Sequence, residues 1–189
     1  MFILFNNKSK KTKIVLSIIG AILLLLGSLA IWLSHEMKIL TAVDIDAEIK
    51  INKPVNEVFA FVSKLNNQQK YANWFEIDTS FTDSNKVQDG EIGFMQKWNL
   101  KDSKDVKGEQ EIVDIRNNQR VDFEIRFIEP TNSITSTYIL TKEIDSFHTM
   151  VNWHYSSNIP EIMKEKMLPV LRNQLQAGIN NMKKIIERK

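Results

Sequence analysis

The stretch from Glu161 to Arg188 constrains the fold most, because its pattern is typical of one long amphipathic helix. Its apolar side chains recur at spacings of three and four, which places them on one stripe. Pro160 suits a first helical turn, whereas Pro169 removes an internal hydrogen bond and predicts a kink or a restart. Such a helix needs an apolar surface to cover its stripe, which comprises Leu168, Leu171, Leu175, Gly178, Ile179, Met182, Ile185 and Ile186.

Segments of alternating apolar and polar residues predict the sheet that covers this stripe. The first is Asp44 to Ile51, and the clearest is Val121 to Phe127, where Asp122, Glu124 and Arg126 alternate with the apolar side chains. Short polar connections predict antiparallel pairing between consecutive strands. Further strands are predicted at 77–82, 92–100, 108–115, 133–142 and 147–155.

Two short helices are expected between the first strand and the rest of the sheet. Pro54 suits a first helical turn, and apolar residues follow it at helical spacing up to Leu65. A second short helix is predicted at 68–75, with Tyr71, Trp74 and Phe75 on its apolar side. The predicted fold class is α+β, with a bent antiparallel sheet that wraps around the C-terminal helix.

A separate element precedes this domain, because the twenty residues from Ile14 to Leu33 carry no charge and thirteen of them are Leu, Ile or Val. At about 1.5 Å per residue, a helix of this length spans roughly 30 Å, the thickness of a hydrocarbon core. A cleavable signal peptide is the alternative, but its apolar region is usually shorter. We therefore predict an uncleaved transmembrane helix at 14–33.

The lysines around this segment predict its orientation. Lys8, Lys10, Lys11 and Lys13 precede it, and only Lys38 follows closely. The positive-inside rule then places a basic tail, residues 1–13, in the cytoplasm. We expect a single-pass protein of the plasma (inner) membrane, with a linker at 34–43 and an extracytoplasmic domain at 44–189. That domain has no basic face of the kind that nucleic acid requires.

The domain resembles the START-like superfamily, also called SRPBCC or polyketide cyclase-like domains. The segment EIKINKPVNEVFAFVSKLNNQQKYANWF is similar to the opening of that superfamily, with matches at Ile51, Pro54, Val58, Phe59, Tyr71 and Trp74. The segments GEIGFMQKW, KGEQEIVDIRNNQRVDFEIRF and GINNMKKIIE are similar to later parts. The resemblance implies a helix-grip fold that binds hydrophobic or amphipathic small molecules between sheet and helix; a minority of members are enzymes.

A pocket of this kind is mostly apolar with a few polar groups, and ordinary core packing is the alternative role for each candidate. Gln110 shares a strand face with Ile112 and is a candidate polar anchor. Gly178 would allow close approach to the helix. The full candidate lining is Trp74, Trp98, Gln110, Ile112, Phe123, Ile125, Phe127, Tyr138, Trp153, Leu171, Leu175, Gly178 and Met182.

No catalytic residue, cofactor or metal ligand is predicted. The sequence contains no cysteine, and His148 and His154 would need carboxylates to complete a metal site. His148 is expected to be a solvated histidine near a turn. The leading hypothesis is a membrane-anchored module that binds a hydrophobic or amphipathic small molecule. A cyclase or dehydratase and a protein-interaction domain remain alternatives, and the protein partner is unknown.

Overall fold

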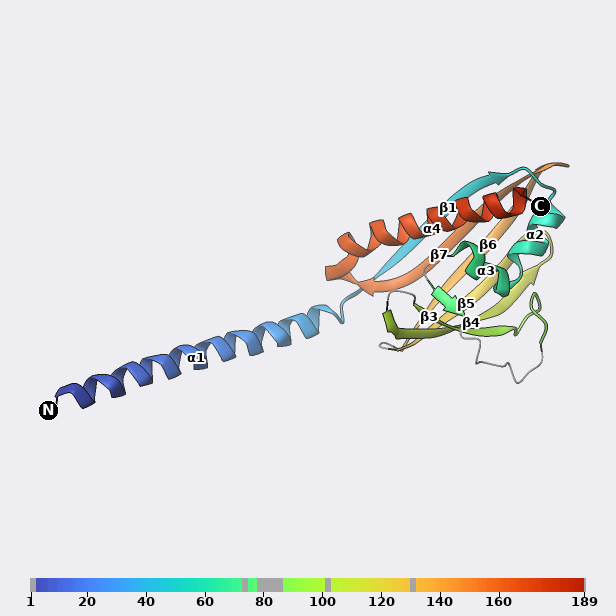
Figure 1. The fold of residues 1–189 in the computed structure, drawn as a ribbon. Helices are drawn as coiled ribbons and strands as arrows, with labels where there is room; N and C mark the ends of the chain where they lie inside the picture. The colour runs from blue at the N-terminus through green and yellow to red at the C-terminus, as the bar shows by residue number, and fades with distance from the viewer. Residues whose placement is uncertain (1–2, 73–74, 78–86, 101–102, 130–131, 189) are drawn as a thin grey trace. The chain divides into compact units, whose positions relative to one another are not determined.

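The structure, a computed structural model, describes residues 3–72, 75–77, 87–100, 103–129 and 132–188 (Figure 1). The chain divides into two compact units. The first comprises Met1–Thr41 and Pro160–Lys164, and the second comprises Ala42–Ile159 and Glu165–Lys189.

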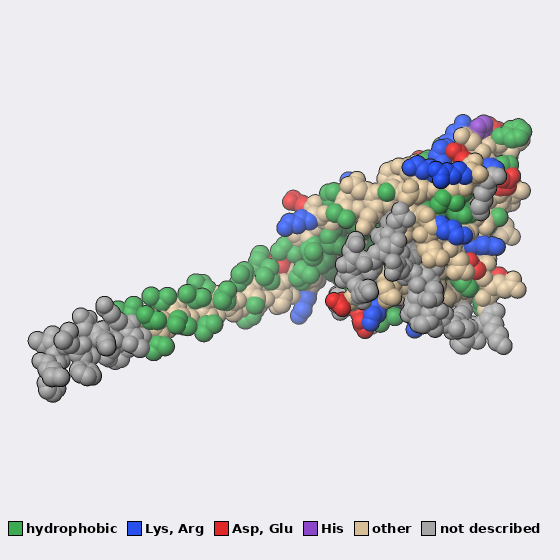
Figure 2. All heavy atoms as spheres, viewed as in Figure 1, with side chains coloured by type: hydrophobic (Ala, Val, Ile, Leu, Met, Phe, Trp, Pro, Cys, Tyr) green, Lys and Arg blue, Asp and Glu red, His purple; other side chains and the backbone are tan. Residues whose placement is uncertain are grey.

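The first unit contains the long helix α1, Ile3–Glu36. The most apolar 18-residue window of its stretch Ile14–Glu36 has a mean hydropathy of 2.8 and no buried residue, so the stretch is long and apolar enough to cross a membrane. Apolar side chains cover the described surface of this helix (Figure 2). The predicted linker at 34–43 is wrong, because α1 runs to Glu36 and strand β1 begins at Leu40. Buried and more exposed residues continue to alternate before Asp44, and β1 is therefore longer than predicted.

The second unit contains a seven-stranded sheet among the described residues, in the order β1-β7-β6-β5-β4-β3-β2. The five neighbouring pairs from β2–β3 to β6–β7 are antiparallel, as the short connections predicted. The strands are β1 Leu40–Ile51, β2 Phe75–Ile77, β3 Met95–Leu100, β4 Ser103–Arg116, β5 Arg120–Glu129, β6 Ser133–Asp145 and β7 His148–Pro160. Most of the strand predicted at 77–82 lies outside the described residues.

Irregularities in the strand register explain how this sheet bends. The β4–β5 pairing shifts between Lys107 and Gly108 and again between Ile112 and Asp114. Further shifts occur in the β3–β4 and β6–β7 pairs. Each bulge leaves an unpaired residue, increases the local twist and bends the strand. The predicted curved sheet is therefore confirmed.

Two short helices, α2 (Val55–Val62) and α3 (Leu65–Tyr71), connect β1 to β2. Pro54 is the residue before α2 rather than part of its first turn. The helix α3 begins earlier than predicted, because the Asp89 carboxylate accepts hydrogen bonds from the backbone N–H groups of Leu65 (2.7 Å) and Asn66 (3.1 Å). Asp89 thus satisfies backbone N–H groups of the first turn that have no partner within the helix. Because this cap comes from residue 89, the sequence next to α3 does not indicate it.

A 3₁₀ turn at Glu161–Met163 leads into the long C-terminal helix α4, Lys164–Glu187. The predicted restart at Pro169 is wrong, because α4 continues through it. Pro169 lies in the second turn of α4, where its ring nitrogen cannot donate a hydrogen bond to the carbonyl of Glu165. The helix lies along the curved sheet (Figure 1).

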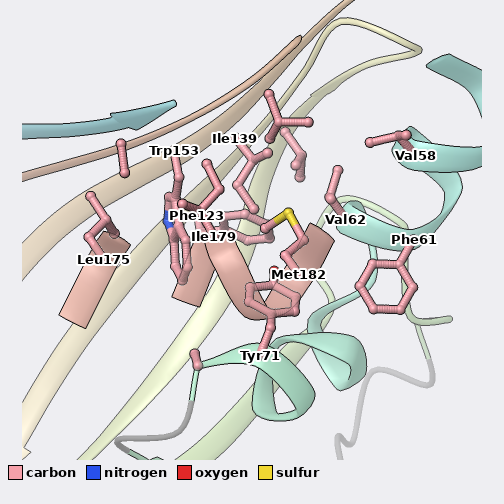
Figure 3. Close-up of a cluster of buried hydrophobic side chains, with 14 of the residues drawn as sticks. Val58, Phe61, Val62, Tyr71, Phe123, Ile139, Trp153, Leu175, Ile179 and Met182 are labelled. Atoms are coloured by element: carbon pink, nitrogen blue, oxygen red, sulfur yellow. The ribbon is translucent and has the colours of Figure 1, made fainter. Parts of the chain in front are cut away.

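The core lies between the sheet, α2, α3 and the second half of α4. Ile179 and Met182 of α4 are fully buried against the sheet residues Phe123 and Ile139, and the fully buried Tyr71 of α3 joins them (Figure 3). The alternation predicted for β5 is confirmed, because Phe123 and Val121 are buried while the charged residues between them lie on the opposite face. The predicted helix-grip fold is thus correct, and the sheet packs most closely against the second half of α4.

Candidate ligand pocket

A pocket of about 280 Å³ separates the first half of α4 from the inner face of the sheet. Cavities of about 150 Å³ with apolar walls hold a benzene molecule. The pocket is therefore large enough for roughly one aromatic ring and a short chain. Its walls are Ile45, Gln68, Trp98, Gln110, Ile125, Phe127, Thr137, Trp153, Tyr155, Ile159, Met167, Leu171, Gln174 and Leu175.

The pocket and the core share the single apolar stripe of α4. Met167, Leu171 and Leu175 face the pocket, whereas Ile179 and Met182 are completely buried in the core. The helices α2 and α3 contribute buried residues to the core around the second half of α4. The same helix face therefore packs tightly at one end and bounds a pocket at the other.

Two tryptophan rings form fixed parts of the wall. The indole of Trp98 covers Gly108 on the neighbouring strand and meets Phe127 edge to face, with ring centroids 5.2 Å apart. Trp153 donates from Nε1 to Thr137 Oγ1 over 2.9 Å, and its ring meets Tyr71 edge to face at 5.4 Å. Both indoles are more than nine-tenths buried. Such contacts hold each ring in one orientation and give the pocket a defined shape.

Besides the two indoles, five lining residues carry uncharged polar groups: Gln68, Gln110, Thr137, Tyr155 and Gln174. Thr137 uses its hydroxyl to donate to the His154 carbonyl and to accept from Trp153. Gln68 and Gln110 are each only 3% exposed, and their Nε2 atoms have no hydrogen-bond partner among the described residues. The described lining contains no carboxylate, ammonium, guanidinium or imidazole group. This set can orient a ligand by hydrogen bonds but offers it no charge.

The neighbouring Tyr71 is fully buried, and burial raises the pKa of its phenol well above the usual range. The Gln68 side chain lies near enough to oppose this shift, but no hydrogen bond of acceptable geometry joins the two side chains. Tyr71 therefore stays a neutral hydroxyl beside the pocket.

The structure brings together seven of the residues predicted to line a pocket. Ile112, Phe123, Gly178 and Met182 share the inner face but are buried in the packed core, where none of them lines the pocket. Trp74 lies outside the described residues. The seven that meet at the pocket are Trp98, Gln110, Ile125, Phe127, Trp153, Leu171 and Leu175.

Tyr138 lies on the other face of the sheet, so its predicted place in the pocket is wrong. Its ring stacks on His154 with centroids 4.5 Å apart, and the guanidinium of Arg120 lies 3.7 Å from its centre. The inward positions of β6 are instead occupied by threonines such as Thr137 and by Ile139. Inward threonines weaken the hydrophobic alternation, so the sequence does not indicate which face of this strand is buried.

The remaining lining residues were not predicted, although the alternation of the strands and the stripe of α4 indicate the face on which some of them lie. Ile45 follows the alternation of β1, and Tyr155 shares the face of Trp153. Met167 and Gln174 fall on the helical stripe of Leu171. Ile159 extends the inner face of β7, whereas Gln68 and Thr137 are polar and gave no signal.

The two domain histidines lie outside the pocket. Asp145 Oδ1 is 2.7 Å from Nδ1 of His148, the first residue of β7, and Asp46 Oδ1 is 3.0 Å from Nδ1 of His154. His148 is thus held by a carboxylate rather than only solvated. Within the described ranges, no group of three or more His, Asp or Glu side chains is arranged to hold a metal ion.

No protein-family model matches the sequence, and no curated protein matches it. Solved structures share its fold. XoxI from Bacillus cereus superposes with a TM-score of 0.58 at 11% identity, over 76% of this chain and 95% of that one. Norcoclaurine synthase from Thalictrum flavum, in complex with dopamine and hydroxybenzaldehyde, gives a TM-score of 0.55 at 8% identity, over 78% and 87%. At these identities the similarity defines the fold alone.

A third neighbour, a protein of the dynemicin biosynthetic locus, gives a TM-score of 0.53 at 9% identity and matches 76% of this chain but only 47% of its own. The sheet, the long helix and these neighbours together show a helix-grip fold, which is the fold class that the sequence predicted.

Proposed function

We propose that this protein is a membrane-anchored binding module whose START-like domain holds a hydrophobic or amphipathic small molecule between the sheet and α4. The observation that carries this proposal is the pocket of about 280 Å³, in which ten of the fourteen lining residues are apolar or aromatic. Its volume is close to the lower limit of about 300 Å³ for small-molecule sites. A binding role accounts for why the sheet and helix do not close on each other along their whole length.

The norcoclaurine synthase complex supports this proposal by analogy of fold. That protein is solved with dopamine and hydroxybenzaldehyde, two compounds with one aromatic ring each. The pocket described above has space for a molecule of that size and a wall of two tryptophans and Phe127. We expect a ligand with one ring or a short branched chain.

An enzyme of the cyclase or dehydratase type is the less favoured alternative. General acid–base catalysis needs a group that gains or loses a proton near the reacting atoms. Tyr155 is the one titratable side chain in the described lining, and the other polar groups there are amides and a threonine hydroxyl. This composition favours binding over catalysis.

A protein-interaction domain is also less favoured. It would require a large continuous apolar patch on the outer face of the sheet. The exposed apolar residues of that face, such as Val113 and Ile134, lie among charged groups. Arg126, for example, donates to Glu111 over 2.7 Å and pairs with Glu109 at 3.3 Å. Such scattered apolar residues are ordinary for a solvated surface.

The proposed anchor is α1, with its N-terminus in the cytoplasm and the domain outside. The absence of cysteine from the chain allows a direct test with single-cysteine variants. Ser146→Cys lies in an exposed turn of the domain, and Ser9→Cys lies among the N-terminal lysines. A membrane-impermeant maleimide applied to spheroplasts should label position 146 and not position 9. Labelling of position 9 alone would reverse the orientation, and release of the protein by alkaline carbonate would exclude an anchor.

Ligand binding is tested by filling the pocket. Leu171→Trp places a large ring into it, and Val170→Trp is the matched control, because Val170 is the adjacent helical residue and is 54% exposed. The full chain, purified in non-ionic detergent, would be analysed by native mass spectrometry with a panel of aromatic and lipid-like compounds. We expect one-to-one adducts with the wild type and Val170→Trp and their loss with Leu171→Trp. Equal adducts in all three proteins, or none in the wild type, would refute the proposal.

A further inference from the structure

Four buried polar atoms without a hydrogen-bond partner gather beside the pocket. They are Gln68 Nε2, Tyr71 Oη, Gln96 Oε1 and Gln110 Nε2, and the described residues contain a single other buried side-chain atom of this kind, Thr141 Oγ1. Buried polar groups are nearly always paired, so each exception calls for an explanation. Four exceptions in one place point to a partner that is not part of the polypeptide.

The fold brings these four side chains together. Gln96 and Gln110 are directly opposite each other in the β3–β4 pair, and both are 3% exposed. Gln96 Nε2 donates to the carbonyl of Leu65 at 3.5 Å, which connects β3 to the first turn of α3. Gln68 follows Leu65 by one turn of that helix, and Tyr71 follows Gln68 by one more. Asp89 holds the start of α3 and thereby positions this group.

Two members of this group, Gln68 and Gln110, also line the pocket. The unpaired polar groups of the lining are therefore at the α3 side of a space whose remaining walls are mostly apolar. An amphipathic ligand would place its polar end here and its apolar part against Trp98, Phe127 and Leu171.

The charges near this group define the chemistry of that polar end. The described lining offers no cation to neutralise a carboxylate or phosphate, and no carboxylate to neutralise an amine. Among the charged groups, Asp89 acts on Tyr71 and opposes negative charge there. Its two carboxylate oxygens already accept backbone hydrogen bonds. Burying an ion without a counter-charge is far more costly than burying a neutral group.

Resting on the proposed function, we infer that the ligand is uncharged and that its hydroxyl or carbonyl oxygen is bound by the carboxamides of Gln68 and Gln110. A carboxamide both donates and accepts, so it suits an alcohol, a ketone, an ester or an amide.

The test compares probes that share one body and differ at one end: phenylbutanol, phenylbutanoate, phenylbutylamine and butylbenzene. Binding to the full chain in nanodiscs would be measured by calorimetry at pH 7, with empty nanodiscs as the reference. We expect phenylbutanol to bind at least about tenfold more tightly than either charged probe, because one unpaired buried charge costs more than that factor. We also expect it to bind more tightly than butylbenzene.

Gln68→Met and Gln110→Met test the residues themselves, since methionine has a similar length and no hydrogen-bonding amide. Each should weaken phenylbutanol binding by about fivefold or more and leave butylbenzene unchanged. Each should also raise the Tm of the ligand-free protein by about 2 °C or more, because an unpaired buried amide is removed. Thr141→Val is the matched control, since it removes an equally unpaired atom outside the pocket and should raise Tm without changing binding.

The outcomes separate this inference from the proposed function. Equal affinity for phenylbutanol and phenylbutanoate would refute the neutral polar end and leave a binding pocket in place. Equal affinity for phenylbutanol and butylbenzene, together with stabilised methionine variants, would mean that the group holds ordered water only, which also refutes the inference. Failure of every probe to bind would count against the proposed function itself. If the variants do not fold, the ranking of probes on the wild-type protein still decides.

Discussion

Replacing Gly108 with alanine should disturb the fold and the pocket at once. Gly108 lies directly opposite Trp98 in the β3–β4 pair, with the indole ring packed over it. A Cβ at this position would lie 2.6 Å from the Arg126 carbonyl oxygen and 2.7 Å from Trp98 Cε2. Ordinary carbon contacts are about 3.5–4.0 Å, so the ring must move by roughly 1 Å. The carbonyl belongs to the β5 backbone and cannot move without straining the sheet.

We expect Gly108→Ala to lower the free energy of unfolding by about 1–3 kcal/mol, the usual cost of overpacking. For a protein of this size, that corresponds to a fall in Tm of about 2–4 °C per kcal/mol. The space open to the displaced ring is the pocket, which Trp98 lines. The same substitution should therefore weaken ligand binding and change the near-ultraviolet circular dichroism of the tryptophans.

The assay is urea unfolding of the full chain in detergent micelles, followed by the far-ultraviolet signal of the sheet. Gly27→Ala is the matched control, because an added Cβ there meets nothing within 4 Å. It should leave the unfolding of the domain unchanged. Wild-type stability in Gly108→Ala, with an unchanged tryptophan spectrum, would contradict the packing of Trp98 over Gly108.

Three further outcomes follow from the same contacts. Met182→Ala should lower the free energy of unfolding, measured with urea, by about 2–5 kcal/mol, because Met182 is fully buried in the core. Leu171→Ala enlarges an existing pocket, so its loss of free energy of unfolding should be well under half of that caused by Met182→Ala. Trp153→Phe should lower the free energy of unfolding by about 0.5–1.5 kcal/mol beyond the effect of its lost area, because Thr137 loses a donor. Hydrogen bonds from the Phe147 backbone N–H and from His148 lower the pKa of Asp145, so its contribution to the turn before β7 should be complete above its ordinary value of 3.8 and lost as the pH falls below it. Amide protection of that turn by NMR should show this loss, and Asp145→Asn should show no such pH dependence.

Local patterns were sufficient to predict the elements of this fold. The strict alternation of β5 and the stripe of α4 identified the inner face of the sheet and the covering helix. Both signals are strong because one side of each element is buried and the other is solvated. The order of elements then left few arrangements, and the structure has the predicted one.

The division of that inner face into core and pocket could not be predicted. Met182 and Leu171 lie on one stripe and have similar character, yet one is fully buried in the core and the other lines the pocket. The difference depends on how far bulges such as that near Ile112 bend the sheet. Gln68 belongs to α3, whose first turn is capped by Asp89, 24 residues beyond Leu65 in the sequence. Neither effect leaves a periodic signal in the sequence.

Photo-crosslinking most directly tests whether the space beneath the first half of α4 is a binding site. A phenylbutanol derivative with a diazirine on its chain would be irradiated with the full chain in nanodiscs, and the adducts mapped by peptide mass spectrometry. The account predicts adducts at 153–159 and 167–175 that excess phenylbutanol abolishes and that Leu171→Trp prevents. Adducts confined to α1, or adducts that neither the competitor nor the substitution changes, would contradict it.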